Sequence, residues 1–268
     1  MPHQAALFDD NWLRESWRYR ELFYFFAWRD VKLRYKQTVL GAAWAIIQPL
    51  FTMVIFTVLF GRFAGMPSDG IPHPIFYYSA LVPWTYFAGT LAYSANSLLS
   101  NASLLTKVYF PRVALPASTV LSGLVDFAVA SLVLVAMMAY YGVPLGWRLL
   151  LWPALVVPLV MLALGVGMFL AALNVRFRDV KHAIPFVTQL WLFVTPIIYP
   201  SSIVPERLRL LLALNPLTGL IEGFRASILP DRHLDWPLLV VSCGLTVGIL
   251  TLGAWYFRRT EQTFVDVI

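Results

Sequence analysis

The stretch "LLLWPALVVPLVMLALGVGMFLAAL" (Leu149–Leu173) contains no charged residue along its whole length. A helix needs about 20 mainly apolar residues to cross the hydrocarbon core of a bilayer, so this stretch is long enough to span a membrane. It is followed by "NVRFRDVKH" (Asn174–His182), which concentrates charged side chains in one short turn, and then by a second uncharged run, Ala183–Pro200. This alternation predicts two membrane-spanning helices joined by a polar turn at one membrane face.

The composition of the whole chain agrees with a membrane location. Of its 268 residues, 59% are hydrophobic and 13% are charged, whereas soluble domains carry about 25% charged residues. The net charge of +6 would suit nucleic acid. However, the basic residues lie at the ends of apolar segments, where lipid headgroups and orientation signals explain them better. We therefore expect an integral membrane protein that contacts membrane lipids and no nucleic acid.

Six apolar windows predict an all-α fold with six transmembrane helices. They are Val39–Phe60, Ile75–Leu98, Pro116–Tyr141, Leu149–Leu173, Ala183–Pro200 and Leu238–Phe257. The fifth window is the shortest, and Pro185 and Pro196 interrupt it. We expect a single transmembrane domain over residues 1–268, with a cytoplasmic N-terminal segment at 1–38, a six-span core at 39–257 and a cytoplasmic tail at 258–268.

The distribution of Lys and Arg residues predicts the orientation of these helices. With six spans, fourteen of the 20 basic residues fall in the N-terminal segment, the second and fourth connections and the C-terminus, and six fall on the other side. Because Lys and Arg are enriched in cytoplasmic connections, both termini and the turn at Asn174–His182 should be cytoplasmic. The charges of this turn either serve only as an orientation signal or also dock a partner.

The N-terminal segment predicts an amphipathic helix that lies in the headgroup plane. Its basic stripe at helical spacing contains Arg14, Arg18, Glu21, Arg29, Lys32 and Lys36. An aromatic arc lies beside this stripe, and a basic stripe on an aromatic body is typical of an interfacial helix. Three charged residues, Arg20, Asp30 and Arg34, do not fit the stripe. The alternative is that these basic residues serve only as a positive-inside anchor that sets the orientation of the chain.

The fifth connection, Ser201–Trp236, contains two apolar segments that are too short to span a membrane. "LRLLLAL" and "LTGLIEGFRASIL" have a helical period, and Asn215–Pro216 separates them. Two short re-entrant or interfacial helices fit this pattern, because non-helical backbone at membrane depth is tolerated only against protein or a cavity. An extra broken helix pair without a function is the alternative.

Asp126 is the one carboxylate that lies clearly inside a predicted span. Acidic residues at this depth are costly and often functional, so one interpretation is a proton site. The other interpretation is structural, with Asp126 bonded to a neighbouring helix or to an Arg of the N-terminal helix. We favour the structural interpretation.

Aromatic residues make up 15% of the chain, and several lie far from the predicted helix ends. The candidates for a channel wall are Tyr77, Trp84, Tyr86, Phe87, Trp191 and Phe193. Aromatic faces stack on the apolar faces of sugars while Tyr and Trp still form hydrogen bonds, so such a wall would let a polysaccharide slide. Core packing and an interfacial aromatic belt are the plainer explanations.

The sequence carries no motif for nucleotide binding or catalysis. It has no phosphate-binding loop of the P-loop type, and its four histidines lack metal-ligand spacing. We therefore expect a transport subunit that is not an enzyme and binds no cofactor or metal. ATP hydrolysis would have to come from another chain.

Five stretches in order along the chain carry a resemblance to a known family. They are "RDVKLRYKQTVLGAAWAIIQPL" (Arg29–Leu50), "KVYFPRVALPAS" (Lys107–Ser118), "LVDFAVA" around Asp126, "LNVRFRDVKH", and "NPLTGLIEGFR" (Asn215–Arg225). Together they resemble the membrane subunit of ABC-2 type exporters of polysaccharides, the O-antigen, capsule and teichoic acid group. The resemblance covers nearly the whole chain.

This resemblance implies an ATP-driven exporter that moves a lipid-linked, O-antigen-like polysaccharide across the bacterial inner (plasma) membrane. It implies a homodimer of this chain with two copies of a cytoplasmic ATPase, which would hold the ATP and Mg2+. The cytoplasmic loops would contact the ATPase through Lys107, Tyr109, Arg112, Arg176, Arg178, Asp179 and Lys181.

The resemblance also gives roles to two other groups of residues. Basic residues near the first span would attract the lipid diphosphate by charge-assisted bonds, and these are Arg29, Lys32, Arg34 and Lys36. The short helices of the fifth connection would gate the outer face, with Asn215, Pro216, Glu222 and Arg225.

Three rival functions stay open at this point. An ABC-2 exporter of a drug or a lipid would have the same architecture. An integral membrane glycosyltransferase or acyltransferase would need carboxylates or histidines that converge at one membrane face, and the loops offer no such cluster. A proton-coupled carrier would depend on Asp126 alone.

Overall fold

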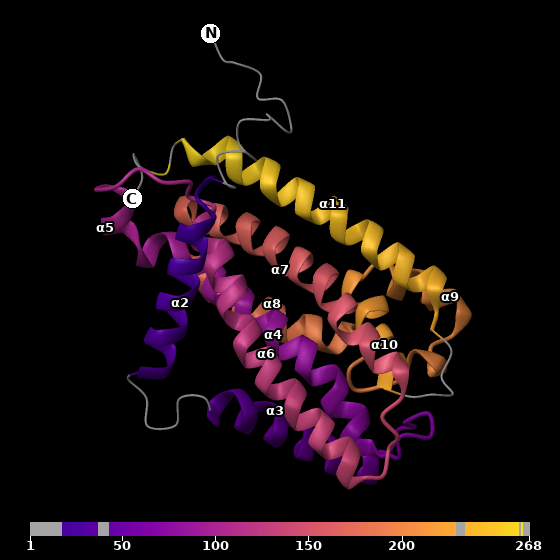
Figure 1. Cartoon of the computed structure of the whole chain (residues 1–268). Helices are drawn as coiled ribbons and strands as arrows, with labels where there is room; N and C mark the ends of the chain where they lie inside the picture. Colours follow the sequence, from indigo (N-terminus) through magenta and orange to yellow (C-terminus); the bar gives the residue numbers. More distant parts are fainter. Residues whose placement is uncertain (1–17, 37–42, 229–233, 263, 265–268) are drawn as a thin grey trace.

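The computed structural model describes residues 18–36, 43–228, 234–262 and 264, and within these ranges the chain forms helices and connections without a strand (Figure 1). The α-helices are α2 (Arg20–Lys36), α3 (Ala43–Phe56), α4 (His73–Ser100), α5 (Ala102–Leu105), α6 (Ala114–Tyr140), α7 (Leu151–Arg176), α8 (Val180–Val194), α9 (Glu206–Ala213), α10 (Pro216–Ile228) and α11 (Trp236–Glu261). Three short helices of other types are the π-helix η1 (Thr57–Phe63) and the 3-10 helices η2 (Trp147–Leu150) and η3 (Ser201–Ile203). The all-α fold is confirmed for the described residues.

Four helical segments are long and apolar enough to cross a membrane. They are Ala43–Phe63, Ala114–Tyr140, Trp147–Arg176 and Trp236–Glu261. These segments contain most of the first, third, fourth and sixth apolar windows of the sequence. The chain is therefore built as a membrane protein with several crossing helices, and the predictions for these four windows are confirmed.

The second window lies in α4, which has 28 residues and is central to the bundle. Eighteen of these residues are buried, because α4 packs against α3, α6, α7, α8 and α10. A helix that its neighbours shield on most faces does not need the apolar surface of a lipid-facing helix. The serines, threonines and tyrosines of α4 are therefore compatible with a central position.

The fifth window, Ala183–Pro200, is not one continuous helix. α8 has 15 residues and ends at Val194, which makes it about 22 Å long at 1.5 Å per residue, shorter than a hydrocarbon core of about 30 Å. Thr195 adopts an extended conformation, as a residue before a proline prefers, and residues 195–200 form a mostly buried, non-helical segment. The prediction of six spans is therefore neither confirmed nor contradicted at this position.

α7 and α11 approach each other at two glycines. A Cβ atom added to Gly253 would lie 2.1 Å from the carbonyl oxygen of Gly165, and one added to Gly165 would lie 2.7 Å from the Cα of Leu250. Small residues at membrane helix interfaces let backbones approach in this way, and the resulting van der Waals contact drives association in lipid. This contact packs α11 closely against α7.

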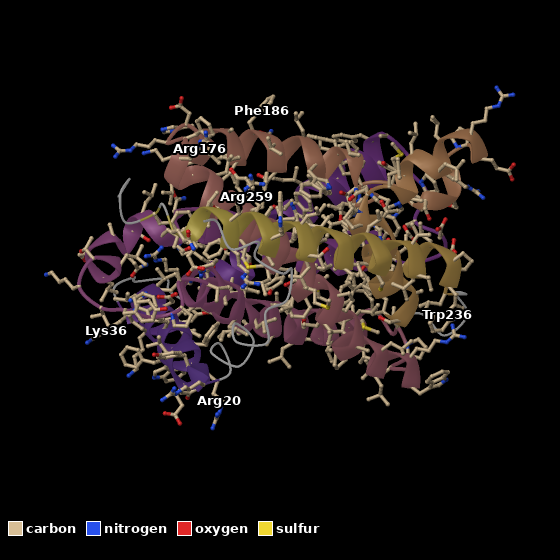
Figure 2. All side chains as sticks on the ribbon, turned by 90° about the horizontal axis from the view of Figure 1, so that it is seen from above. Arg20, Lys36, Arg176, Phe186, Trp236 and Arg259 are labelled. Atoms are coloured by element: carbon tan, nitrogen blue, oxygen red, sulfur yellow. The ribbon has the colours of Figure 1, made fainter. Side chains whose placement is uncertain are left out.

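One end of the bundle collects the N-terminal helix and the end of the last helix (Figure 1). There, α2 packs on α6, and Phe26 contacts Phe110 with ring centroids 5.4 Å apart. Phe257 of α11 packs on Phe264 in the same apolar cluster. Figure 2 shows Lys36 and Arg176 near this end and Trp236 at the opposite end.

Candidate functional site

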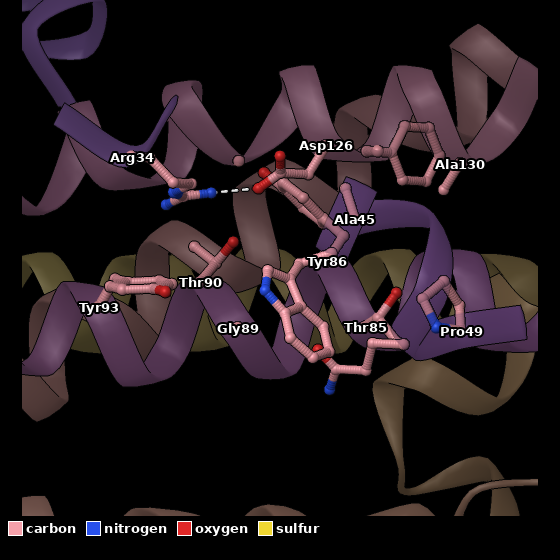
Figure 3. Close-up of a pocket in the computed structure, with 14 residues that line it drawn as sticks. Arg34, Ala45, Pro49, Thr85, Tyr86, Gly89, Thr90, Tyr93, Asp126 and Ala130 are labelled. Atoms are coloured by element: carbon pink, nitrogen blue, oxygen red, sulfur yellow. Dashed lines mark hydrogen bonds and ion pairs between the residues drawn. The ribbon is translucent and has the colours of Figure 1, made fainter. Parts of the chain in front are cut away.

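The carboxylate of Asp126 lies on α6 and faces the N-terminal helix (Figure 3). Arg34 donates from Nη1 to one carboxylate oxygen, and the hydroxyl of Tyr35 donates to the other. The guanidinium of Arg34 also lies 4.5 Å from the ring centroid of Tyr93 on α4. The prediction that Asp126 bonds an Arg of the N-terminal helix is confirmed.

Burial raises the pKa of the Tyr35 hydroxyl, and its pairing with Asp126 raises this pKa further. Burial of the hydroxyl has the largest effect, and the hydrogen bond to Asp126 adds to it, because both disfavour the charged phenolate. Tyr35 therefore stays a neutral donor to Asp126.

The face of α2 that packs on α6 contains two of the three charged residues that did not fit the predicted stripe, Asp30 and Arg34, whereas Arg20 is exposed. Asp30 accepts a hydrogen bond of 2.9 Å from the hydroxyl of Ser118, and Arg34 lies one turn further along, on Asp126. The opposite face exposes aromatic rings, with Tyr24 70% exposed and Trp28 50% exposed. An exposed aromatic face suits a helix at the membrane surface, so an interfacial position of α2 stays a prediction that this geometry favours. Arg14 lies outside the described residues.

A cavity of about 380 Å³ lies beside the Arg34–Asp126 pair. Residues of α2, α3, α4 and α6 line it, among them Trp44, Gln48, Thr85 and Thr90 (Figure 3). This volume is within the range of about 300–1,000 Å³ that small-molecule sites occupy. The cavity is therefore large enough to hold a ligand.

The four basic residues predicted to attract a lipid diphosphate are only partly available. Arg29 forms an ion pair with Asp30 at 2.9 Å, and Arg34 is paired with Asp126. Lys32 and Lys36 are exposed, and the ammonium of Lys32 lies 5.6 Å from the ring centroid of Trp28. Two neighbouring carboxylates therefore offset the charge of the arginines, and the two lysines supply most of the remaining positive charge of this group.

The turn that joins α7 to α8 exposes its charged side chains on the surface of the chain. Arg176, Arg178, Asp179 and Lys181 are all exposed, and Arg176 lies over the ring of Phe177, 5.4 Å from its centroid. α7 ends at Arg176 and α8 begins at Val180, so the turn connects these two helices directly. A contact made here would reach both helices.

The second predicted coupling loop contains residues of two kinds. Lys107 and Tyr109 are exposed, with Tyr109 80% exposed. Arg112 is half-buried instead: its backbone N–H donates to Glu261 Oε1 at 3.3 Å, and its guanidinium donates to the Glu261 carbonyl oxygen. Arg112 therefore ties the loop to the end of α11, and within this chain its position favours a structural role over a direct partner contact.

Most of the predicted channel aromatics pack inside the chain. Tyr77, Trp84, Tyr86 and Phe87 are at most 5% exposed. Phe87 makes an edge contact with Trp191 at 5.2 Å, and the Tyr86 hydroxyl donates to the Val120 carbonyl oxygen at 3.1 Å. This packing favours the core explanation for these residues, whereas Phe193 is 53% exposed and is available as a wall residue.

The predicted outer-gate residues form two buried clamps on the non-helical segment after α8. In the first clamp, Asn215 accepts a hydrogen bond from Trp191 Nε1 at 3.0 Å and donates to Thr195 Oγ1 at 2.9 Å. Its neighbour Pro216 begins α10, whose 13 residues are all buried. The first clamp therefore joins the end of α8 to the residue that precedes α10.

The second clamp is centred on Arg225, which is fully buried. Its guanidinium donates to the carbonyl oxygens of Pro196 and Ile197 and to Glu222 Oε1, the last at 3.2 Å. It also lies 3.8 Å from the ring centroid of Phe76 at the start of α4. α8, α10 and α4 are thereby fixed to one another, which favours a rigid unit over a hinged gate at these residues.

Comparisons with known proteins agree with this architecture. A family model described as ABC-2 type transporter matches residues 21–229. The chain belongs to this ABC-2 type transporter family. The O-antigen export system permease protein RfbA of Myxococcus xanthus is 33% identical over 260 residues, which cover 96% of this chain and 98% of that protein.

Two further relatives extend the ABC-2 similarity to other organisms. An O-antigen export system permease protein RfbA of Klebsiella pneumoniae is 31% identical, over 90% of this chain and 92% of its own length. The polysialic acid transport protein KpsM of Escherichia coli is 24% identical, over 88% of this chain and 92% of its own length. As an ABC-2 family member, the chain is a membrane transport subunit.

Several residues of this ABC-2 subunit gain importance only from the structure. Gln48, Thr85, Thr90 and Tyr93 line the cavity beside Asp126, and sequence reasoning gave them no role. The signal that could have pointed to them is that they are isolated polar residues within apolar windows, and such residues are rare at membrane depth. Among the described residues, no three His, Cys, Asp or Glu side chains lie together as a metal site.

Proposed function

We propose that this chain is the membrane-spanning subunit of an ATP-driven exporter of a lipid-linked polysaccharide, similar to O-antigen. The observation that carries the proposal is similarity over nearly the full length to permeases named for O-antigen export, with 33% identity across 98% of one of them. The expected direction is from the cytoplasmic to the outer side of the bacterial inner membrane.

ATP hydrolysis would occur in a separate cytoplasmic ATPase that holds ATP and Mg2+, with two copies per transporter. The exposed charges of the turn between α7 and α8 support docking of this partner, because Arg side chains form forked, charge-assisted bonds with carboxylates. Since the turn joins α7 and α8 directly, movement of the ATPase would reach both helices together.

A homodimer of this chain would enclose the path of the polymer. Supporting this, α8 exposes a continuous apolar face, with Phe186 64% exposed, Leu190 50% exposed and Phe193 53% exposed. Lipid or a second copy covers such a face in a membrane, and the short length of α8 favours contact with protein.

Six spans with cytoplasmic termini complete the proposal, with α4 as the second span and α8 with residues 195–200 as the fifth. Single cysteines at Ser68, His182 and Ser202, introduced after Cys243→Ser, test this topology. Ser68 and Ser202 positions should react with an impermeant reagent in whole cells, and the position of His182 should react only after permeabilisation. Labelling of position 182 from outside would contradict the proposed orientation.

The function itself is tested by deletion and complementation. Cells that lack this chain should lose surface glycan and accumulate lipid-linked polymer inside, and the intact chain should restore export. A cytoplasmic ATPase should co-purify with the tagged chain. Unchanged surface glycan together with lost resistance to a drug would instead favour the rival drug exporter.

A further inference from the structure

The cavity beside the Arg34–Asp126 pair lies deep along the helices that surround it. Asp126 is twelve residues beyond the start of α6 at Ala114, about 18 Å along the helix axis. Thr90 is ten residues before the end of α4 at Ser100, about 15 Å along its axis. Polar side chains at such depth face protein partners or a polar occupant, because lipid tails cannot satisfy them.

The charges at the cavity wall cancel. Arg34 and Asp126 are the charged residues among its lining, and they are bonded to each other. A diphosphate would therefore meet no net positive charge here. A carboxylate accepts up to about four hydrogen bonds, so Asp126 can receive a further donor while it keeps Arg34 and Tyr35.

The remaining lining combines aromatic rings with neutral hydrogen-bonding groups. Gln48 supplies an amide that both donates and accepts, and Thr85 and Thr90 supply hydroxyls. Trp44 and Tyr93 line the same space and are 55% and 54% exposed. Aromatic rings stack on the apolar faces of sugar rings, while polar groups nearby form hydrogen bonds with the sugar hydroxyls. The Thr85 hydroxyl already donates to the Val82 carbonyl oxygen at 3.2 Å and can accept from a ligand. An acyl chain would offer no partner to the amide of Gln48 or to the free lone pairs of Asp126.

We propose that this cavity binds a neutral pyranose ring of the exported glycan while the glycan is still in the inner half of the membrane subunit. The assignment rests on the proposed function and adds a sugar-binding subsite within a single copy of the chain. In it, Asp126 accepts from a sugar hydroxyl and the Gln48 amide accepts from or donates to another. Trp44 or Tyr93 covers the apolar face of the ring.

Gly89 allows the cavity to be filled without a clash at the first atom. It lines the cavity, and a Cβ atom added to it meets nothing within 4 Å. Gly89→Phe should therefore occupy the sugar space. Gly248→Phe on α11 is the matched control, because its added Cβ also meets nothing within 4 Å and the residue is exposed away from the cavity.

Glycan export is expected to fall about tenfold or more in Gly89→Phe, near the low end of what one misfitted group costs in a pocket. The control should export normally, and both variants should reach the same membrane level with bound ATPase. If Gly89→Phe does not accumulate, Thr85→Val serves instead, since it keeps the shape and removes one hydroxyl. Normal export in the accumulated variant would overturn the subsite.

Photo-crosslinking in cells that make the glycan gives a direct reading. Benzoylphenylalanine at Thr85 should yield a crosslinked band that stains for carbohydrate, and the same group at Gly248 should not. A band at Thr85 that contains lipid alone, or no band while export continues, would overturn the sugar assignment and leave the exporter function standing. Loss of the whole chain without any effect on surface glycan would instead overturn the proposed function.

Discussion

Replacing Arg225 with methionine decides whether the outer helices form a fixed clamp or a moving gate. Arg225 is fully buried, and its guanidinium binds the carbonyl oxygens of Pro196 and Ile197 as well as Glu222. The methionine side chain fills much of the same space but offers no donor. Two carbonyl oxygens and the Glu222 carboxylate would therefore each lose the bond to Arg225, while Glu222 keeps the Ser201 backbone N–H at 3.4 Å. The clamp interpretation predicts a loss of folded protein.

The expected loss of stability follows from these contacts. Removing one partner of a buried ion pair costs about 3–5 kcal/mol. An independent figure agrees: hydrogen bonds to a charged group contribute about 1.5–3 kcal/mol each, and two carbonyl bonds give a similar range. For a chain of this size, about 2–4 °C of melting temperature per kcal/mol converts the loss to roughly 6–20 °C.

The assay is thermal melting of the purified chain in detergent, followed by the fraction that stays monodisperse. Arg209→Met is the matched control, because Arg209 is exposed on α9 in the same outer connection. Its melting temperature should stay within about 2 °C of the parent, as surface substitutions usually do. A variant at Arg225 that melts like the parent but no longer exports would refute the clamp and restore the moving gate.

Three further substitutions test other parts of the molecule. Arg176→Lys with Arg178→Lys keeps the charge and the topology but should weaken co-purification of the ATPase, because Lys cannot copy the forked bonds of Arg; unchanged binding and export would leave the turn as an orientation signal only. Asp126→Asn should retain most export, whereas Asp126→Leu should lower the level of folded protein by leaving Arg34 and Tyr35 without their acceptor; loss of export in the Asn variant at normal level would favour the proton carrier. Gly253→Ala should cost about 1–3 kcal/mol of stability by forcing α7 and α11 apart, seen as a lower melting temperature than that of Gly244→Ala, whose added Cβ meets nothing within 4 Å.

Sequence reasoning located α4, α6, α7 and α11 within a few residues and was less successful with α8, which ends inside its predicted window. Apolar runs with at most one charged residue predicted α6, α7 and α11 well, because the cost of polar groups in lipid leaves a strong pattern. α4 and α8 carried weaker signals. Neighbouring helices surround α4, so it can carry polar residues that weaken its apolar pattern. Pro196 follows the extended Thr195, so α8 ends at Val194, before its apolar window ends.

The sequence pointed to some of the polar residues that make buried contacts, but it did not predict most of their partners. Asp126 attracted attention because it is a lone acid in an apolar window, and an Arg of α2 was expected beside it. Arg225 was assigned to a gate, and its full burial could not be foreseen, since its partners are backbone carbonyl oxygens that any sequence provides. The cavity depends on how four helices diverge, which no local pattern encodes.

The bonds between α2 and α6 also constrain how the chain is made. Arg34 and Asp126 are 92 residues apart in the sequence, and Tyr35 and Asp126 are 91 apart. At a synthesis rate of about 5–20 residues per second, the ribosome adds the acceptor roughly 5–20 seconds after the donors. During that interval α2 has no acid to hold it, so a chain stalled before the third apolar window exposes an undocked, aromatic-rich helix to chaperones and proteases. We therefore expect chaperones and proteases to act on α2 mainly before Asp126 reaches the membrane.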